Sequence, residues 1–298
     1  MPRLPSNGLS LEFESAGDPA APPVLLIMGL GMPAAAWPDA LVALLVRQGL
    51  RVIRFDNRDC GGSSRIEAAE KATALPLAIA RALLRLPVSA PYSLEDMALD
   101  AEGLLDALGI ARAHIVGVSM GGMIGQVLAA RAPHRVASLV SIMSGTGNPR
   151  TGLGKTRALH ALLSRPEDAD DVAKVAAHYL KIYGVIGSPG FEQDETALRA
   201  HLERVAARGY DAAGTARQLL AILASGDRRS ALARITAPTL VIHGASDPLL
   251  PPAAGRETAR CIRGARLLMI DGMGHDLPGP LLPRLAEEIG SFCHNAGR

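Results

Sequence analysis

The chain has 298 residues, of which 48% are hydrophobic and 20% are charged, and its formal net charge is +2. This composition fits a globular protein with a large core and excludes an intrinsically disordered chain. Acidic and basic residues are interleaved without a long basic block, so we expect no nucleic-acid partner.

The cysteines and the apolar segments indicate the cellular compartment of the protein. Cys60, Cys261 and Cys293 lie far apart, with neither the spacing of a metal site nor that of a disulfide framework, and we expect no metal. Residues 1–18 contain no apolar signal region, and no apolar stretch reaches the roughly 18 residues that a membrane-spanning helix needs. The sequence predicts a cytoplasmic protein without stable membrane insertion, and leaves a homodimer open.

Short apolar runs alternate with helical patterns along most of the chain. Residues 9–15 alternate in polarity, which predicts an antiparallel edge strand. The stronger runs are residues 23–28, 51–56, 114–118, 136–143, 238–243 and 265–270. Continuous apolar strands separated by helices predict an α/β fold, in which helices cover both faces of a parallel sheet.

Two stretches interrupt this alternation. Residues 65–91 are apolar with interspersed cations, which is typical of a flap over a pocket, of a partner-facing surface, or of an extra helix packed on the core. Residues 145–234 lack strong strand patterns. They suggest helices at residues 157–164, 170–183, 194–208 and 213–224. We therefore predict a helical cap at 145–234, between the two parts of an α/β core at 1–144 and 235–298.

A G-x-S-x-G motif follows the strand pattern at 114–116 and precedes a helical pattern. Its residues are Gly117, Val118, Ser119, Met120 and Gly121. The two glycines relieve crowding in a sharp strand-to-helix turn, where a serine hydroxyl can be held out as a nucleophile. The alternative is an ordinary tight turn with a solvent-facing serine.

A nucleophilic serine needs a base, and the base needs an orienting acid. His275 follows the last predicted strand in a glycine-flanked loop, and Asp247 follows the strand before it. The chain order Ser119, Asp247, His275 is that of α/β-hydrolases. Asp227, Asp271 and Asp276 are rivals for the acid.

Two backbone donors are needed for the oxyanion of an acyl-transfer intermediate. We expect them at Met120, directly after the nucleophile, and at Leu30, in the glycine-rich loop after the first strong strand. Several side chains near strand ends predict an adaptable apolar pocket, although core packing is the alternative for the methionines. These residues are Met28, Met32, Trp37, Met143, Tyr183 and Met273.

The segment DNRDCGGS at residues 56–63 resembles the D-x-R-G-x-G-x-S segment of the α/β-hydrolase superfamily, with Asp59 where glycine is more usual. Residues 28–31, followed by Trp37, are similar to the corresponding loop of aclacinomycin methylesterase and its relatives. Residues 116–122 fit that subgroup too. The resemblance covers nearly the whole chain. It implies an eight-stranded, mostly parallel sheet, a helical cap after the sixth strand, and ester hydrolysis without a cofactor.

These features predict a serine carboxylesterase that acts on small to medium uncharged esters through an acyl-enzyme. The same three residues could instead serve C–C bond or lactone hydrolysis, acyl transfer or perhydrolysis. A non-catalytic ligand-binding protein of the same fold is the alternative from another class.

Overall fold

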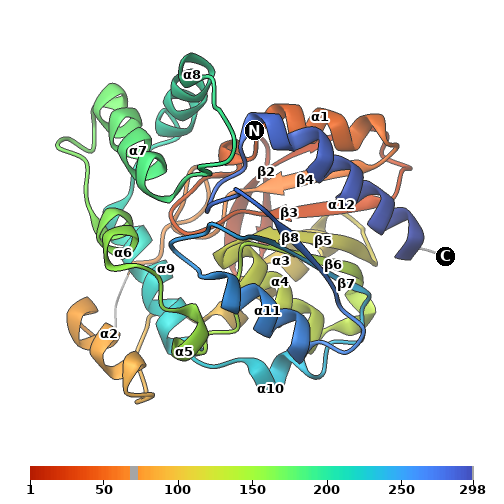
Figure 1. Cartoon of the computed structure of the whole chain (residues 1–298). Helices are drawn as coiled ribbons and strands as arrows, with labels where there is room; N and C mark the ends of the chain where they lie inside the picture. The colour runs from red at the N-terminus through yellow and green to blue at the C-terminus, as the bar shows by residue number, and fades with distance from the viewer. Residues whose placement is uncertain (68–72, 297–298) are drawn as a thin grey trace.

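Eight strands form one sheet in the order β1-β2-β4-β3-β5-β6-β7-β8 (Figure 1). The computed structural model describes residues 1–67 and 73–296. The strands are β1 (Arg3–Ser6), β2 (Leu9–Ala16), β3 (Pro23–Ile27), β4 (Arg51–Phe55), β5 (Ala113–Val118), β6 (Val136–Ile142), β7 (Thr239–Gly244) and β8 (Arg266–Ile270). From β4 to β8 along the sheet all pairs are parallel, which confirms the predicted, mostly parallel eight-stranded sheet.

The predicted edge strand is antiparallel but does not form the edge. It corresponds to β2, which pairs with β4 on one side and with β1 on the other. Asn7 and Gly8 both have positive φ, of 49° and 76°, and join β1 to β2 by a two-residue turn. Such turns match the twist of a hairpin, so the short β1 becomes the edge strand that the sequence pattern did not indicate.

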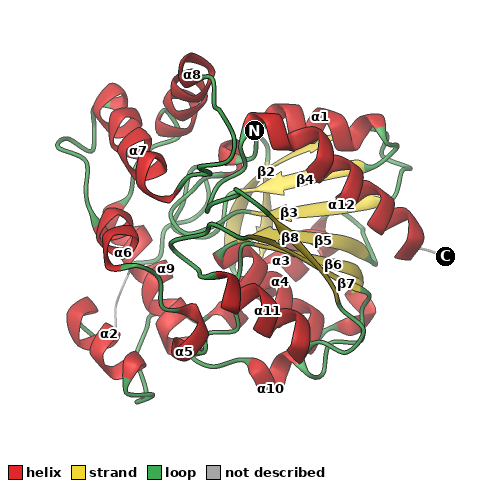
Figure 2. Cartoon of the chain, in the orientation of Figure 1, coloured by secondary structure: helices red, strands yellow, loops and turns green. Residues whose placement is uncertain are grey.

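Helices cover both faces of the sheet (Figure 2). On one face lie α1 (Asp39–Arg47) and α12 (Leu282–Ala296), and on the other lie α3 (Leu94–Ala107), α4 (Met120–Arg131) and α11 (Pro252–Cys261). Short 3₁₀ turns occur at Ala34–Ala36, Pro133–Arg135 and Gly279–Leu281. Each helical layer buries its apolar side against the sheet, and this packing fixes the loops at the strand ends. No helix in the described ranges is long and apolar enough to cross a membrane.

The insertion, residues 145–234, lies between β6 and β7 at one end of the sheet (Figure 1). Its helices are α5 (Pro149–Gly152), α6 (Thr156–Leu163), α7 (Val172–Ile186), α8 (Glu195–Ala206), α9 (Ala212–Ser225) and α10 (Arg229–Leu232). The four helices expected from the sequence correspond to α6, α7, α8 and α9, with slightly different ends. The division of the chain into a core and a cap domain stays a prediction.

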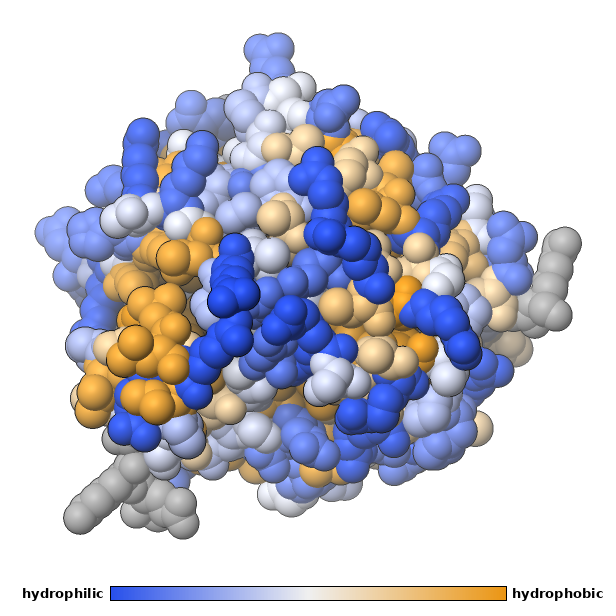
Figure 3. All heavy atoms as spheres, turned by 60° about the horizontal axis from the view of Figure 1, so that its bottom comes forward, coloured by the Kyte–Doolittle hydropathy of each residue, from blue (hydrophilic) through white to orange (hydrophobic). Residues whose placement is uncertain are grey.

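The segment expected at residues 65–91 contains one helix, α2 (Leu75–Leu83), and residues 68–72 lie outside the described ranges. The helix packs against α9, so it is an addition to the insertion rather than to the sheet. Leu77, Leu83, Leu84 and Leu86 are exposed, and a hydrophobic area covers this part of the molecule (Figure 3). The segment therefore does contain a helix, but this helix packs on the insertion and not on the core, and much of its apolar surface faces outward.

Asp59, which stands where the related motif has glycine, ties the insertion to the core. Its backbone has a positive φ of 65°, the conformation that favours glycine. Its carboxylate accepts hydrogen bonds from the Tyr92 hydroxyl at 2.6 Å, from the Ile66 N–H at 2.7 Å, and from Arg217 of α9 at 2.8 and 2.9 Å. These bonds stabilise the aspartate despite its backbone conformation.

We expect Asp59→Gly to lower the free energy of unfolding by roughly 2 kcal/mol, although it relieves the backbone strain at this position. Removing one partner of a buried ion pair leaves the other charge unpaired, which outweighs about 1 kcal/mol of relieved strain. Denaturant unfolding of Asp59→Gly, Arg217→Met and the double variant measures this effect. The double variant should lose less free energy of unfolding than the two single variants lose together. Strict additivity would show that Asp59 and Arg217 are not coupled.

Candidate active site

Ser119 lies at a sharp turn between β5 and α4, with φ 53° and ψ −119°. A Cβ at Gly117 would lie 2.2 Å from the carbonyl oxygen of Gly121, and one at Gly121 would lie 2.0 Å from that of Ile27. Both positions therefore require glycine, as the motif predicted. The Ser119 N–H donates to the Ile142 carbonyl at 2.9 Å, which fixes the turn against β6.

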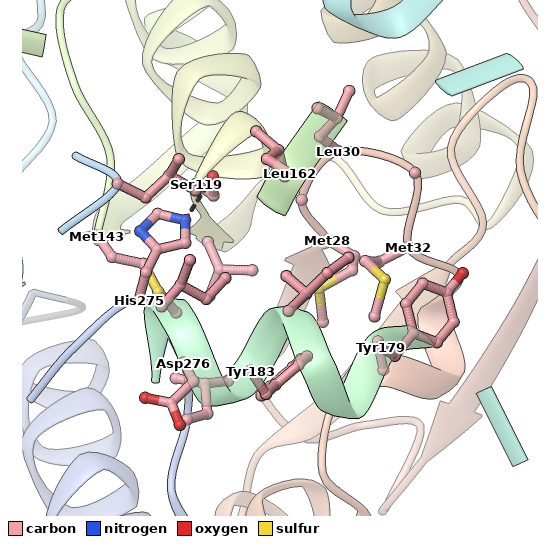
Figure 4. Close-up of a pocket in the computed structure, with 18 of the residues that line it drawn as sticks. Met28, Leu30, Met32, Ser119, Met143, Leu162, Tyr179, Tyr183, His275 and Asp276 are labelled. Atoms are coloured by element: carbon pink, nitrogen blue, oxygen red, sulfur yellow. Dashed lines mark hydrogen bonds between the residues drawn. The ribbon is translucent and has the colours of Figure 1, made fainter. Parts of the chain in front are cut away.

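The structure brings Ser119, His275 and Asp247 together in one line of hydrogen bonds. Figure 4 shows the bond between Ser119 and His275. His275 Nε2 lies 3.0 Å from Ser119 Oγ, and His275 Nδ1 lies 2.7 Å from Asp247 Oδ2. A ring that donates from Nδ1 to the carboxylate leaves Nε2 free to accept the serine proton. This geometry is that of a nucleophile, a base and an orienting acid.

The carboxylate of Asp247 is held from its other side as well. Its Oδ1 accepts hydrogen bonds from the N–H groups of Leu249 and Leu250 at 2.8 and 2.9 Å, and only 4% of the residue is exposed. The rivals lie elsewhere. Asp227 pairs with an arginine, Asp271 is exposed, and Asp276 accepts hydrogen bonds from two side chains of the insertion.

The loop that carries His275 is attached to the end of α7 and the residues that follow it. The His275 N–H donates to the Ile186 carbonyl at 2.7 Å, and the Gly274 N–H donates to Ser188 Oγ at 2.8 Å. Asp276 accepts hydrogen bonds from Ser188 Oγ and from Gln193 Nε2. Its carboxylate points away from Ser119 (Figure 4), so it supports the loop rather than the hydroxyl. Burial raises the pKa of Asp276.

The two expected oxyanion donors lie on either side of the serine. Met120 is the first residue of α4, and Leu30 lies in the loop after β3. A Cβ at Gly29 would lie 3.3 Å from Ser119 Cβ and 3.9 Å from Oγ, so this loop passes directly beside the hydroxyl. Within the described ranges, the Leu30 N–H donates to no protein acceptor.

Ser119 and His275 open onto a cavity of about 270 Å³ between the strand ends and the insertion. Four of the side chains expected in a pocket line it, namely Met28, Met32, Met143 and Tyr183 (Figure 4). Leu30 and several leucines and isoleucines of α6, α7 and α9 complete a lining that is mostly apolar.

Two expected pocket residues do not line the cavity. Trp37 and Met273 are fully buried and belong to the hydrophobic core on the side of α1 and α12. Trp37 follows the 3₁₀ turn at Ala34–Ala36 and packs with Leu41 and Leu45 of α1. All six residues were expected in the pocket because they lie beside strand ends. Four of them line the cavity, and the other two lie in the core.

Two histidines of the insertion also line the cavity. His178 of α7 is 8% exposed, and His201 of α8 lies on the same cavity wall. Burial lowers the pKa of both, which favours neutral rings. The His178 ring lies near those of Tyr179 and Tyr210, with centroids 6.3 Å apart. No signal in the sequence showed which face of these helices meets the cavity.

Comparison with known proteins identifies relatives of the chain. A family model described as alpha/beta hydrolase fold matches residues 22–180, and one described as TAP-like protein matches residues 224–280. Rhodomycin D methylesterase of Streptomyces peucetius is 32% identical over 308 residues, which cover 96% of this chain and 95% of that protein.

Two lactonases are also similar. The 3-oxoadipate enol-lactonase 2 of Acinetobacter baylyi is 29% identical over 255 residues, covering 85% of this chain and 82% of that protein. The crystal structure of the enol-lactonase from Burkholderia xenovorans has a TM-score of 0.71 at 27% identity, covering 98% of this chain and all of that one. The resemblance predicted from the motifs is confirmed: the chain belongs to the α/β-hydrolase family and is a hydrolase.

Proposed function

We propose that this hydrolase is a serine carboxylesterase that cleaves small to medium uncharged esters through an acyl-enzyme. The single observation that carries the proposal is the hydrogen-bonded line of Ser119, His275 and Asp247, which opens onto an apolar cavity. The similarity to a methylesterase supports ester bonds as the target.

The proposed reaction has two halves. Ser119 Oγ attacks the ester carbonyl while His275 Nε2 takes the hydroxyl proton, and the same proton then passes to the leaving alcohol. Water next attacks the acyl-serine, with His275 as base, and releases the acid. Asp247 fixes the ring through Nδ1 and stabilises the imidazolium in both halves. The chemistry needs no cofactor.

Charge that develops on the carbonyl oxygen would be bound by the N–H groups of Leu30 and Met120. Backbone donors in a site closed to water stabilise such an oxyanion strongly because they need no reorganisation. The close approach of the Gly29 backbone to Ser119, and the position of Met120 directly after the nucleophile, support this pair.

The cavity lining supports an uncharged substrate. Among the described lining residues, Asp276 is the one carboxylate, and no lysine or arginine is present. The Asp276 carboxylate is already bound by Ser188 and Gln193. A charged acyl or alcohol group would be desolvated there without a fixed partner, which is costly.

Lactone opening is a second candidate, favoured by the similarity to two enol-lactonases. A lactone is an internal ester, so the same residues would act in the same order. The test measures turnover of open-chain methyl or p-nitrophenyl esters of graded length and turnover of lactones of similar size. The ratio of these two turnover numbers decides between the esterase and the lactonase.

The proposal predicts a burst of p-nitrophenol when the protein is mixed with a short p-nitrophenyl ester, with one equivalent released per protein molecule. A fluorophosphonate should label Ser119 and abolish the burst, because it traps the same activated hydroxyl. Stopped-flow absorbance and mass spectrometry of the labelled peptide measure these outcomes. A folded protein that gives no burst and no label would instead be a non-catalytic binding protein.

Asp247→Asn should lower kcat by three to four orders of magnitude, roughly the effect known for an amide at this place in other triads, because the amide disfavours the productive tautomer of His275. The thermal midpoint should change far less. Asp271→Asn is a matched control, since Asp271 is an exposed aspartate four residues from His275. Steady-state kinetics check both variants, and a fully active Asp247→Asn would refute the assignment of the acid.

Ser119→Ala and Ser119→Gly should both lose turnover, but they should differ in stability. The positive φ at this position strains every residue except glycine, so Ser119→Gly should be more stable than Ser119→Ala by about 1 kcal/mol. At Ser291, an exposed position in α12, the order should be reversed because glycine weakens a helix. Thermal unfolding of the four variants measures the difference, and equal stability of the two Ser119 variants would contradict the strain.

A further inference from the structure

The loop after β3 has little internal support, although it passes beside the reactive hydroxyl. Its own backbone makes one turn bond, from the Met32 N–H to the Gly29 carbonyl at 3.3 Å. Glycine stands at two of its positions, and Gly31 has a positive φ of 67°. A loop of this kind keeps one conformation only if neighbouring groups hold its peptide units.

Gln218 of α9 supplies such a contact from the insertion. The side chain is fully buried, and its Oε1 accepts a hydrogen bond from the Gly31 N–H at 2.7 Å. Its Nε2 donates to the Arg58 carbonyl at 2.7 Å. One amide therefore joins the loop after β3 to the loop after β4, and both of its polar ends are used.

A second contact from the same helix fixes the same residue. A Cβ at Gly31 would lie 2.7 Å from Thr215 Oγ1, so α9 packs directly on the backbone of Gly31. At the start of the loop, Asn57 Nδ2 donates to the Met28 carbonyl at 3.0 Å.

The peptide unit between these two anchors carries the expected oxyanion donor. Asn57 holds the carbonyl of the peptide between residues 28 and 29, and Gln218 holds the N–H of the peptide between residues 30 and 31. The N–H of Leu30 belongs to the peptide in the middle. With both neighbours fixed, the peptide that carries this N–H has little freedom to rotate.

We propose that Gln218 is a positioning residue of the oxyanion hole, which acts through Gly31 to aim the Leu30 N–H at the substrate carbonyl. This inference rests on the proposed esterase function. It makes the insertion a part of the catalytic machinery as well as the wall of the cavity, because Thr215, Leu219 and Ile222 of the same helix line that cavity.

The test compares Gln218→Met with wild type on a p-nitrophenyl ester and on an aryl trifluoromethyl ketone, which forms an oxyanion with the serine. Gln218→Met keeps about the same side-chain volume but removes both hydrogen bonds. We expect kcat to fall by roughly 10- to 100-fold with KM within about threefold, because a misplaced donor weakens the transition state more than the ground state. Affinity for the ketone should fall by the same factor as kcat.

Two further variants separate positioning from general damage. Gln126→Met removes another fully buried glutamine, which lies in α4 and donates to Ser141, and it should leave ketone affinity unchanged. Gln218→Glu keeps an acceptor for the Gly31 N–H, but its ionised carboxylate would face the Arg58 carbonyl with no proton to donate and would be repelled from its place. Its ketone affinity relative to wild type should therefore rise as the pH falls. Gln218→Met should show no such rise.

The outcomes distinguish this inference from the proposed function. If wild type neither hydrolyses the ester nor binds the ketone, the proposed function is wrong, and the inference is wrong with it. If wild type does both and Gln218→Met binds the ketone equally well, only the role of Gln218 is refuted. An equal loss in Gln126→Met, or a Gln218→Glu variant without pH-dependent recovery, would also refute it.

Discussion

The strained turn at Ser119 is the constraint on which the site depends. A serine with φ 53° is held at a cost of about 1–3 kcal/mol, and only the surrounding structure can maintain it. The turn is bound on the β6 side by the Ile142 carbonyl, which accepts from its N–H, and by Ser144, whose hydroxyl donates to its carbonyl at 2.8 Å. Gly121 lets the backbone of β3 pass directly behind it. The order of the strands in the sheet therefore maintains both the strained backbone of Ser119 and the position of its hydroxyl.

The insertion supports both loops that face this turn. On one side, the Ile186 carbonyl accepts from the N–H of His275, and Ser188 supports the glycine before it. On the other side, Gln218 holds Gly31 in the loop after β3. The segment that shapes the cavity therefore also fixes, in our proposal, both the base and one oxyanion donor. In our proposal, a shift of α7 or α9 would therefore alter the reaction geometry.

Local sequence signals predicted the parts of this protein that local physics determines. All strands except β1, the sharp G-x-S-x-G turn and the chain order of Ser119, Asp247 and His275 follow from short patterns. A parallel sheet brings the carboxyl ends of its strands to one edge. Contacts between distant segments could not be predicted in this way. Gln218 lies 187 residues from Gly31, and a helical period shows that one face is apolar but not what that face meets. Trp37 shows the same limit, since residues beside a strand end can face the core.

Asp59 illustrates how such long-range contacts change the meaning of a motif. At a position where the related segment has glycine for its backbone freedom, this chain accepts the strained conformation and gains a buried acceptor for Arg217. Arg208, which follows α8, similarly binds Asp56 at 3.0 Å. These arginines bring their charge to the core loop after β4, and neither of them lines the cavity. The insertion is therefore fixed by ion pairs while the cavity lining stays mostly apolar. Substrate orientation must then come from shape and from backbone donors, which is why the conformation of the loop beside Ser119 has so much influence on the proposed reaction.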